Sequence, residues 1–174
     1  VLPVHGLLPP PPDGEPFTFL FVGTLGYYPN EDAARWLCGA VLPELRRLAS
    51  RPFRLAIVGD WAPESVRALA SLAEVEIVGR VADLVPWYRR AGAVVVPIRA
   101  GGGTRIKVLE AFAYRRAVVS TTVGIEGIDA RANEHLLVAD DPASFAAQCV
   151  RLMDDPQLAE RLTEAACDRV ARVY

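Results

Sequence analysis

The sequence predicts an α/β protein with a doubly wound parallel sheet, and two observations carry this prediction. Short apolar runs alternate along the chain with helical patterns, and the connections between them are short. The apolar runs are hydrophobic at nearly every position, which is typical of strands buried on both faces. Because strand–helix–strand units form right-handed crossovers, we expect helices on both faces of a single sheet.

The individual elements follow from the apolar runs and from the positions of proline and aspartate. Strands are expected at residues 17–22, 54–58, 75–78, 93–98, 117–120 and 136–139, and helices at 30–49, 63–72, 83–90, 105–113, 142–153 and 156–174. Pro43 should kink or divide the first helix, because proline cannot donate the backbone hydrogen bond of an inner helical position. Asp83, Asp141 and Asp155 stand where three of the helices begin, as capping residues do.

Length and composition indicate one globular domain preceded by a linker. The chain has 174 residues, of which 52% are hydrophobic and 23% charged, and this is enough for one substantial core. Residues 1–16 are rich in proline, so we expect an extended interdomain linker there, with the domain at 17–174. The chain lacks an initiating Met and stops within a helical pattern, which suggests a fragment of a longer protein.

Several classes of protein are disfavoured by composition. A formal net charge of −2 gives no overall electrostatic surface for nucleic acid. No apolar run approaches the roughly 20 residues that cross a bilayer. The three cysteines have no CxxC spacing and there are two histidines, so we expect reduced thiols, no metal site and a cytoplasmic location.

The most informative segment runs from Gly101 to Ala113 and reads GGGTRIKVLEAFA. It lies between two predicted strands, at a turn where a parallel sheet presents backbone N–H groups to an anion. Thr104 is the expected N-cap, which places Arg105 and Lys107 in the first helical turn. Cations are unfavourable at a helix N-terminus, and a bound phosphate would reverse that effect.

Helical spacing gives this segment a second chemical function. Lys107, Glu110 and Tyr114 fall along one stripe of the helix. Ile106, Leu109 and Ala113 take another face. Lys107 could therefore meet a phosphate while Glu110 accepts hydrogen bonds from sugar hydroxyls. The alternative is a flexible glycine loop before an ordinary amphipathic helix whose charges face water.

Glycines also follow three other predicted strands, and the carboxyl ends of parallel strands share one edge of a sheet. Gly23, Gly59 and Gly79 stand at these ends, which together suggest a cleft lined by backbone. The patterns GxGxxG, GxxxxGK[ST] and GxSxG are absent. Nicotinamide enzymes, nucleoside triphosphatases and α/β-hydrolases are therefore disfavoured.

Taken in order, the segments 21–30, 57–60, 75–81, 101–111 and 117–121 resemble retaining GT-B glycosyltransferases of family 4 type (glycosyl transferases group 1). The resemblance implies a Rossmann-like, C-terminal half of the GT-B fold, which binds a nucleoside diphosphate sugar as donor substrate and needs no further cofactor. It implies a catalytic role for Arg105 and Lys107, which would stabilise the departing diphosphate. Donor contacts are expected from Gly23, Thr24, Gly59, Arg80, Val81, Leu84, Gly102, Gly103, Thr104, Val108 and Glu110.

This sequence departs from the family pattern at two places. The family has a donor-contacting glutamate separated by seven residues from the glutamate that matches Glu110, and Gly102 stands there. Two phosphate-binding cations of the family correspond to Thr24 and Pro29. Arg105 and Lys107 are placed to replace those cations.

The resemblance also implies a partner, because the acceptor-binding half of such an enzyme would precede residue 1. The chain is then expected to bind donor without turning it over, and to meet the inner face of the membrane only through the missing half. Two alternatives stay open. One is a nucleotide-sugar epimerase on the same fold, and the other is a degenerate module that binds a nucleotide or a protein.

Overall fold

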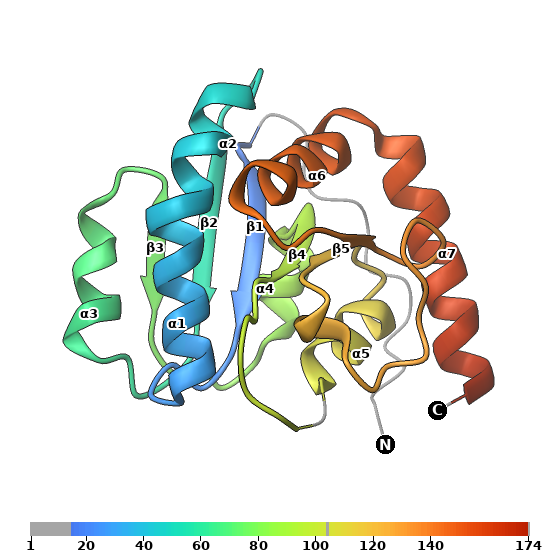
Figure 1. The fold of residues 1–174 in the computed structure, drawn as a ribbon, viewed down its shortest axis with the longest axis horizontal. Coiled ribbons are helices and arrows are strands. Elements are labelled where there is room, and N and C mark those ends of the chain that lie inside the picture. The colour runs from blue at the N-terminus through green and yellow to red at the C-terminus, as the bar shows by residue number, and fades with distance from the viewer. Residues whose placement is uncertain (1–14, 104, 174) are drawn as a thin grey trace.

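The computed structural model describes residues 15–103 and 105–173 of the chain. Residues 1–14 of the predicted linker and Thr104 lie outside the described residues, and the division at residue 16 stays a prediction. Six parallel strands form one sheet in the order β3-β2-β1-β4-β5-β6 (Figure 1). The strands are β1 (Phe17–Val22), β2 (Phe53–Val58), β3 (Val75–Val78), β4 (Ala93–Val96), β5 (Val118–Ser120) and β6 (Leu137–Val138).

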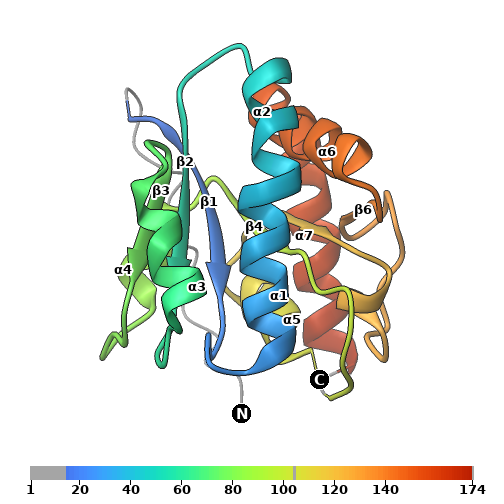
Figure 2. The same ribbon diagram turned by 60° about the vertical axis from the view of Figure 1, so that its left-hand side comes forward.

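Helices cover both faces of the sheet, which confirms the doubly wound arrangement. Figures 1 and 2 show α1, α2 and α6 on one face and α4 and α5 on the other, while α7 packs against α5. The connecting helices change from one face of the sheet to the other because the chain runs outward from β1 to β3 and then returns past β1 to β4. The helices are α1 (Tyr28–Trp36), α2 (Leu42–Leu48), α3 (Glu64–Arg67), α4 (Val85–Arg90), α5 (Ile106–Ala113), α6 (Pro142–Asp154) and α7 (Pro156–Val173).

The first long helix is divided, as Pro43 predicts. A π-helical segment, Leu37–Val41, separates α1 from α2, and Pro43 lies in the first turn of α2, the position in a helix where proline is best tolerated. None of the described helices is long and apolar enough to cross a membrane.

Two of the three predicted aspartate caps are confirmed, those of α6 and α7, and the third aspartate stands one residue before the N-cap of α4. Asp83 accepts a hydrogen bond from the Val85 amide at 2.9 Å. Asp141 accepts one from the Ser144 amide, and Asp155 one from the Leu158 amide, both at 2.9 Å. Asp141 and Asp155 fix where α6 and α7 begin, whereas Leu84 occupies the N-cap position of α4.

The loops after β1 and β2 pack against each other backbone to backbone. A Cβ atom on Gly59 would lie 1.7 Å from the Gly23 carbonyl oxygen, so no side chain fits at position 59. Two backbone hydrogen bonds join these loops, from Gly23 N to Val58 O at 3.0 Å and from Leu25 N to Asp60 O at 2.9 Å. The sheet edge therefore depends on the glycine at position 59.

We expect Gly59→Ala to destabilise the fold by about 3 kcal/mol, because the loops after β1 and β2 must separate to admit a methyl group. Urea unfolding monitored by circular dichroism measures this. Gly79→Ala is the matched control, since a Cβ at Gly79 meets nothing within 4 Å. Equal stability of the two variants would contradict the close approach.

Candidate functional site

The carboxyl ends of β1, β2 and β4 meet at one edge of the sheet, the lower edge in Figure 1, where α1 and α5 begin. The chain order reverses between β1 and β4, and open parallel sheets bind ligands at such a switch point. The described residues of the predicted site come from the loops after β1, β2, β3 and β4 and from the first two turns of α5.

The glycine-rich loop after β4 packs on the start of α1. Gly101 and Gly103 have φ angles of +93° and +111°, which glycine adopts without strain. A Cβ on Gly101 would lie 2.5 Å from Cγ of Pro29, whereas one on Gly102 would meet nothing within 4 Å. Position 102 therefore has room for the carboxylate that the sequence lacks.

Arg105 is buried beneath this loop. The residue is only 6% exposed. Its guanidinium donates hydrogen bonds to the Gly101 carbonyl at 2.6 Å and to the Val123 carbonyl at 3.1 Å. Glu126 lies 3.9 Å from the guanidinium. Two backbone carbonyls thus hold Arg105, and the residue braces the loop.

Lys107 reaches from the first turn of α5 to the end of β1. Its Nζ donates to Oδ1 of Asn30 at 2.6 Å and lies 4.9 Å from the centre of the Phe21 ring. Burial, together with the charge of Arg105, lowers the pKa of Lys107 to about 8, and Glu110 acts in the opposite direction. Burial disfavours the charged form of an amine, and a nearby anion favours it.

Glu110 lies one turn further along α5 and is held from α4. The Tyr88 hydroxyl donates to Oε2 of Glu110 at 3.4 Å, and the Tyr88 ring stacks on Tyr114 with centroids 4.2 Å apart. Burial raises the pKa of Glu110 above its ordinary value, while the Tyr88 hydrogen bond and Lys107 oppose that shift. A cation and a carboxylate therefore stand one turn apart at the switch point, as the helical spacing predicts.

A family model described as glycosyl transferases group 1 matches residues 16–155. The chain belongs to this family. A search of curated proteins finds no match.

The chain resembles solved glycosyltransferases of GT-B fold. A glycosyltransferase of Rickettsia africae superposes with a TM-score of 0.71 at 17% identity, covering 92% of this chain and 44% of that protein. The C-terminal domain of LpcC, a group 1 family protein of Francisella tularensis, gives 0.71 at 19% identity, covering 95% of this chain and 88% of that domain. Anabaena HepE in complex with UDP and glucose gives 0.70 at 13% identity, covering 91% and 44%. The chain thus spans less than half of the first and third of these proteins and nearly all of the LpcC domain.

The start of α5 differs by one residue from the prediction for this group 1 domain. The helix begins at Ile106, with Arg105 in the N-cap position, and the predicted cap Thr104 lies outside the described residues. Val108, a predicted donor contact, is 0% exposed, so its side chain belongs to the core. Ile106 is 52% exposed, whereas Leu109, on the same predicted face of the helix, is 6% exposed.

The other predicted residues fall into two places. Gly23 and Thr24, after β1, contact the Asn30 side chain that holds Lys107, and Gly59, after β2, packs on Gly23. Arg80 is exposed on the loop before α4, and the same loop carries Val81 and Leu84, which pack partly against the core.

Two residues that the sequence did not single out complete the site of the group 1 domain. Asn30, read only as the start of a helix, holds Lys107. Tyr88, hidden in an apolar helical pattern, holds Glu110. The first bond joins residues 77 positions apart and the second residues 22 positions apart in different helices, and no local pattern signals such a contact.

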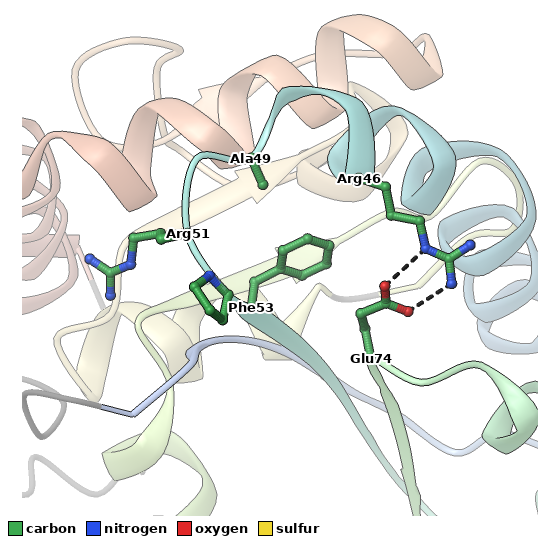
Figure 3. A pocket seen from close by; sticks show the side chains of 6 residues that line it. Arg46, Ala49, Arg51, Phe53 and Glu74 are labelled. Carbon is green, nitrogen blue, oxygen red and sulfur yellow. Dashed lines mark hydrogen bonds and ion pairs between the residues drawn. The ribbon is translucent and has the colours of Figure 1, made fainter.

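A surface pocket lies at the opposite edge of the sheet, where β2 and β3 begin (Figure 3). Arg46 donates to both oxygens of Glu74 at 2.9 and 2.7 Å across one side of it. These bonds lower the pKa of the Glu74 carboxyl and tie α2 to the strand ends. No predicted site residue lines this pocket, and in the described part of the chain no cluster of potential metal ligands occurs.

We expect Tyr88→Phe to raise the pKa of Glu110 further, because the lost hydroxyl donates to the ionised carboxylate. Carboxyl-carbon NMR of selectively labelled glutamate measures the titration midpoint. Glu74, which Arg46 holds at the opposite edge of the sheet, provides an internal reference whose midpoint should not move. An unchanged midpoint for Glu110 would show that Tyr88 does not act on it.

Proposed function

We propose that the chain is the donor-binding half of a retaining glycosyltransferase that uses a nucleoside diphosphate sugar. The observation that carries this proposal is that Lys107 has a neutral hydrogen-bond partner and no ion-paired carboxylate among the described residues. Lys107 is the only lysine of the chain, and no carboxylate among the described residues forms an ion pair with it. Its bonded partner is the neutral amide of Asn30.

A bound diphosphate would supply the negatively charged partner that Lys107 lacks. Desolvation and the charge of Arg105 both disfavour the ammonium, and an anion between Lys107 and the glycine-rich loop would relieve both effects. During transfer, negative charge grows on the departing diphosphate, and a fixed cation in a partly dehydrated site stabilises it. Arg105 would add its charge from beneath the loop while holding the loop in place.

The neighbouring residues fit the other parts of a donor. Glu110, one turn from Lys107, would accept hydrogen bonds from the ribose hydroxyls. The loop that carries Arg80, Val81 and Leu84 would hold the base, and α4 joins this loop to the Glu110 carboxylate through Tyr88. The proteins similar in fold include Staphylococcus aureus TarM and Anabaena HepE, both crystallised with UDP.

The chain should bind donor without completing transfer, since the acceptor-binding half is a separate domain in the GT-B arrangement. Retention of the anomeric configuration, a cytoplasmic location and contact with the membrane through the other half stay predictions. A degenerate nucleotide-binding module is the second candidate. Gly102 favours it, because the donor-contacting carboxylate is missing there.

Isothermal titration calorimetry at pH 7 with UDP, GDP, ADP and their sugars tests the proposal. One nucleoside diphosphate should bind, and Lys107→Met should weaken it at least about tenfold, because a charge-assisted hydrogen bond is lost. Arg47→Met removes one positive charge from α2, at the opposite edge, and is the matched control.

Two further ligands separate a nucleotide site from a simple anion site. The nucleoside of the preferred nucleotide should bind weakly when it carries no phosphate. Pyrophosphate alone should bind less tightly than the preferred nucleotide. Absence of binding by every nucleoside diphosphate at millimolar concentration would overturn the proposal. Pyrophosphate binding as tight as that of any nucleotide would reduce the site to an anion site.

A further inference from the structure

Asn30 has a buried side-chain amide whose nitrogen and oxygen each form a hydrogen bond. The residue is 8% exposed and belongs to the first turn of α1. Its Nδ2 donates to the Thr24 carbonyl at 2.9 Å, and its Oδ1 accepts from Lys107 Nζ at 2.6 Å. One side chain therefore joins the loop after β1 to the cation of α5.

The amide fits only because the residue at the end of β1 has no side chain. A Cβ atom on Gly23 would lie 2.8 Å from Cγ of Asn30 and 2.9 Å from each polar atom of its amide. Gly23 is thus needed to admit Asn30 as well as to let the chain turn. The close packing of Asn30 against Gly23 therefore fixes both the loop after β1 and the position of Lys107.

A neutral partner leaves Lys107 able to bind an anion. The ammonium has three N–H donors, and the hydrogen bond to Asn30 uses one, while the Phe21 ring faces it from another side. A carboxylate at position 30 would neutralise the charge and compete with a phosphate. An amide orients the ammonium and keeps its charge.

We propose that Asn30 is a positioning residue for donor binding, which aims Lys107 at the diphosphate and fixes the Thr24 backbone beside it. This inference rests on the proposed function, because it names what prepares the phosphate-binding cation. Asn30 acts through Lys107 and Thr24 and need not touch the reacting atoms.

Asn30→Asp and Asn30→Ala test the proposal, with Glu31→Ala as control. The Glu31 side chain accepts a hydrogen bond from Ser65 of α3 at 2.6 Å, away from Lys107. Selective ¹³C labelling of lysine reports Lys107 alone. Asn30→Asp should raise the Lys107 titration midpoint, because a carboxylate favours the ammonium, and should still weaken nucleoside diphosphate binding at least about tenfold.

This combination separates positioning from simple charge, since the lysine becomes more fully charged and yet binds less well. Asn30→Ala should weaken binding too, while Glu31→Ala leaves binding and the midpoint unchanged. Wild-type affinity in Asn30→Asp would overturn the proposal. If no nucleoside diphosphate binds the wild-type chain, the proposed function fails; an unchanged Lys107 midpoint in Asn30→Asp would separately overturn the Asn30 contact.

Discussion

The hydrogen bond between Lys107 and Asn30 joins residues 77 positions apart, and the carboxyl edge of the sheet is organised around it. The bond closes α5 onto α1 across the end of β1. It requires glycine at position 23, and the contact between the loops after β1 and β2 requires glycine at 59. The only lysine of the chain is thereby held in a partly dehydrated place beside backbone loops.

The two cations at the start of α5 differ in the groups that hold them. Arg105 satisfies two backbone carbonyls and disfavours the charge of its neighbour, whereas Lys107 keeps a neutral partner. The positions where the resemblance expects cations are Thr24 and Pro29, and Lys107 contacts Asn30, which follows Pro29 in the first turn of α1.

Much of the fold follows from local patterns, and much of the site does not. Strands such as β1 and β4 are continuous apolar runs, and the aspartate caps mark helix starts without reference to the rest of the chain. The stripe shared by Lys107 and Glu110 depends only on helical geometry. The burial of Arg105 depends on carbonyls at Gly101 and Val123, which only the folded chain brings together. The burial of Val108 was not predicted, because the packed face of α5 is set by the neighbouring elements.

The most direct measurement is the titration of Lys107 Cε in lysine-labelled protein, with and without UDP or GDP. Lys107 should titrate near pH 8 instead of its ordinary 10.5. The bound diphosphate should raise that midpoint, because an anion favours the ammonium, so binding takes up protons and weakens as pH rises above 8, by up to about tenfold per pH unit. A midpoint near 10.5 that neither nucleotide moves would contradict the account.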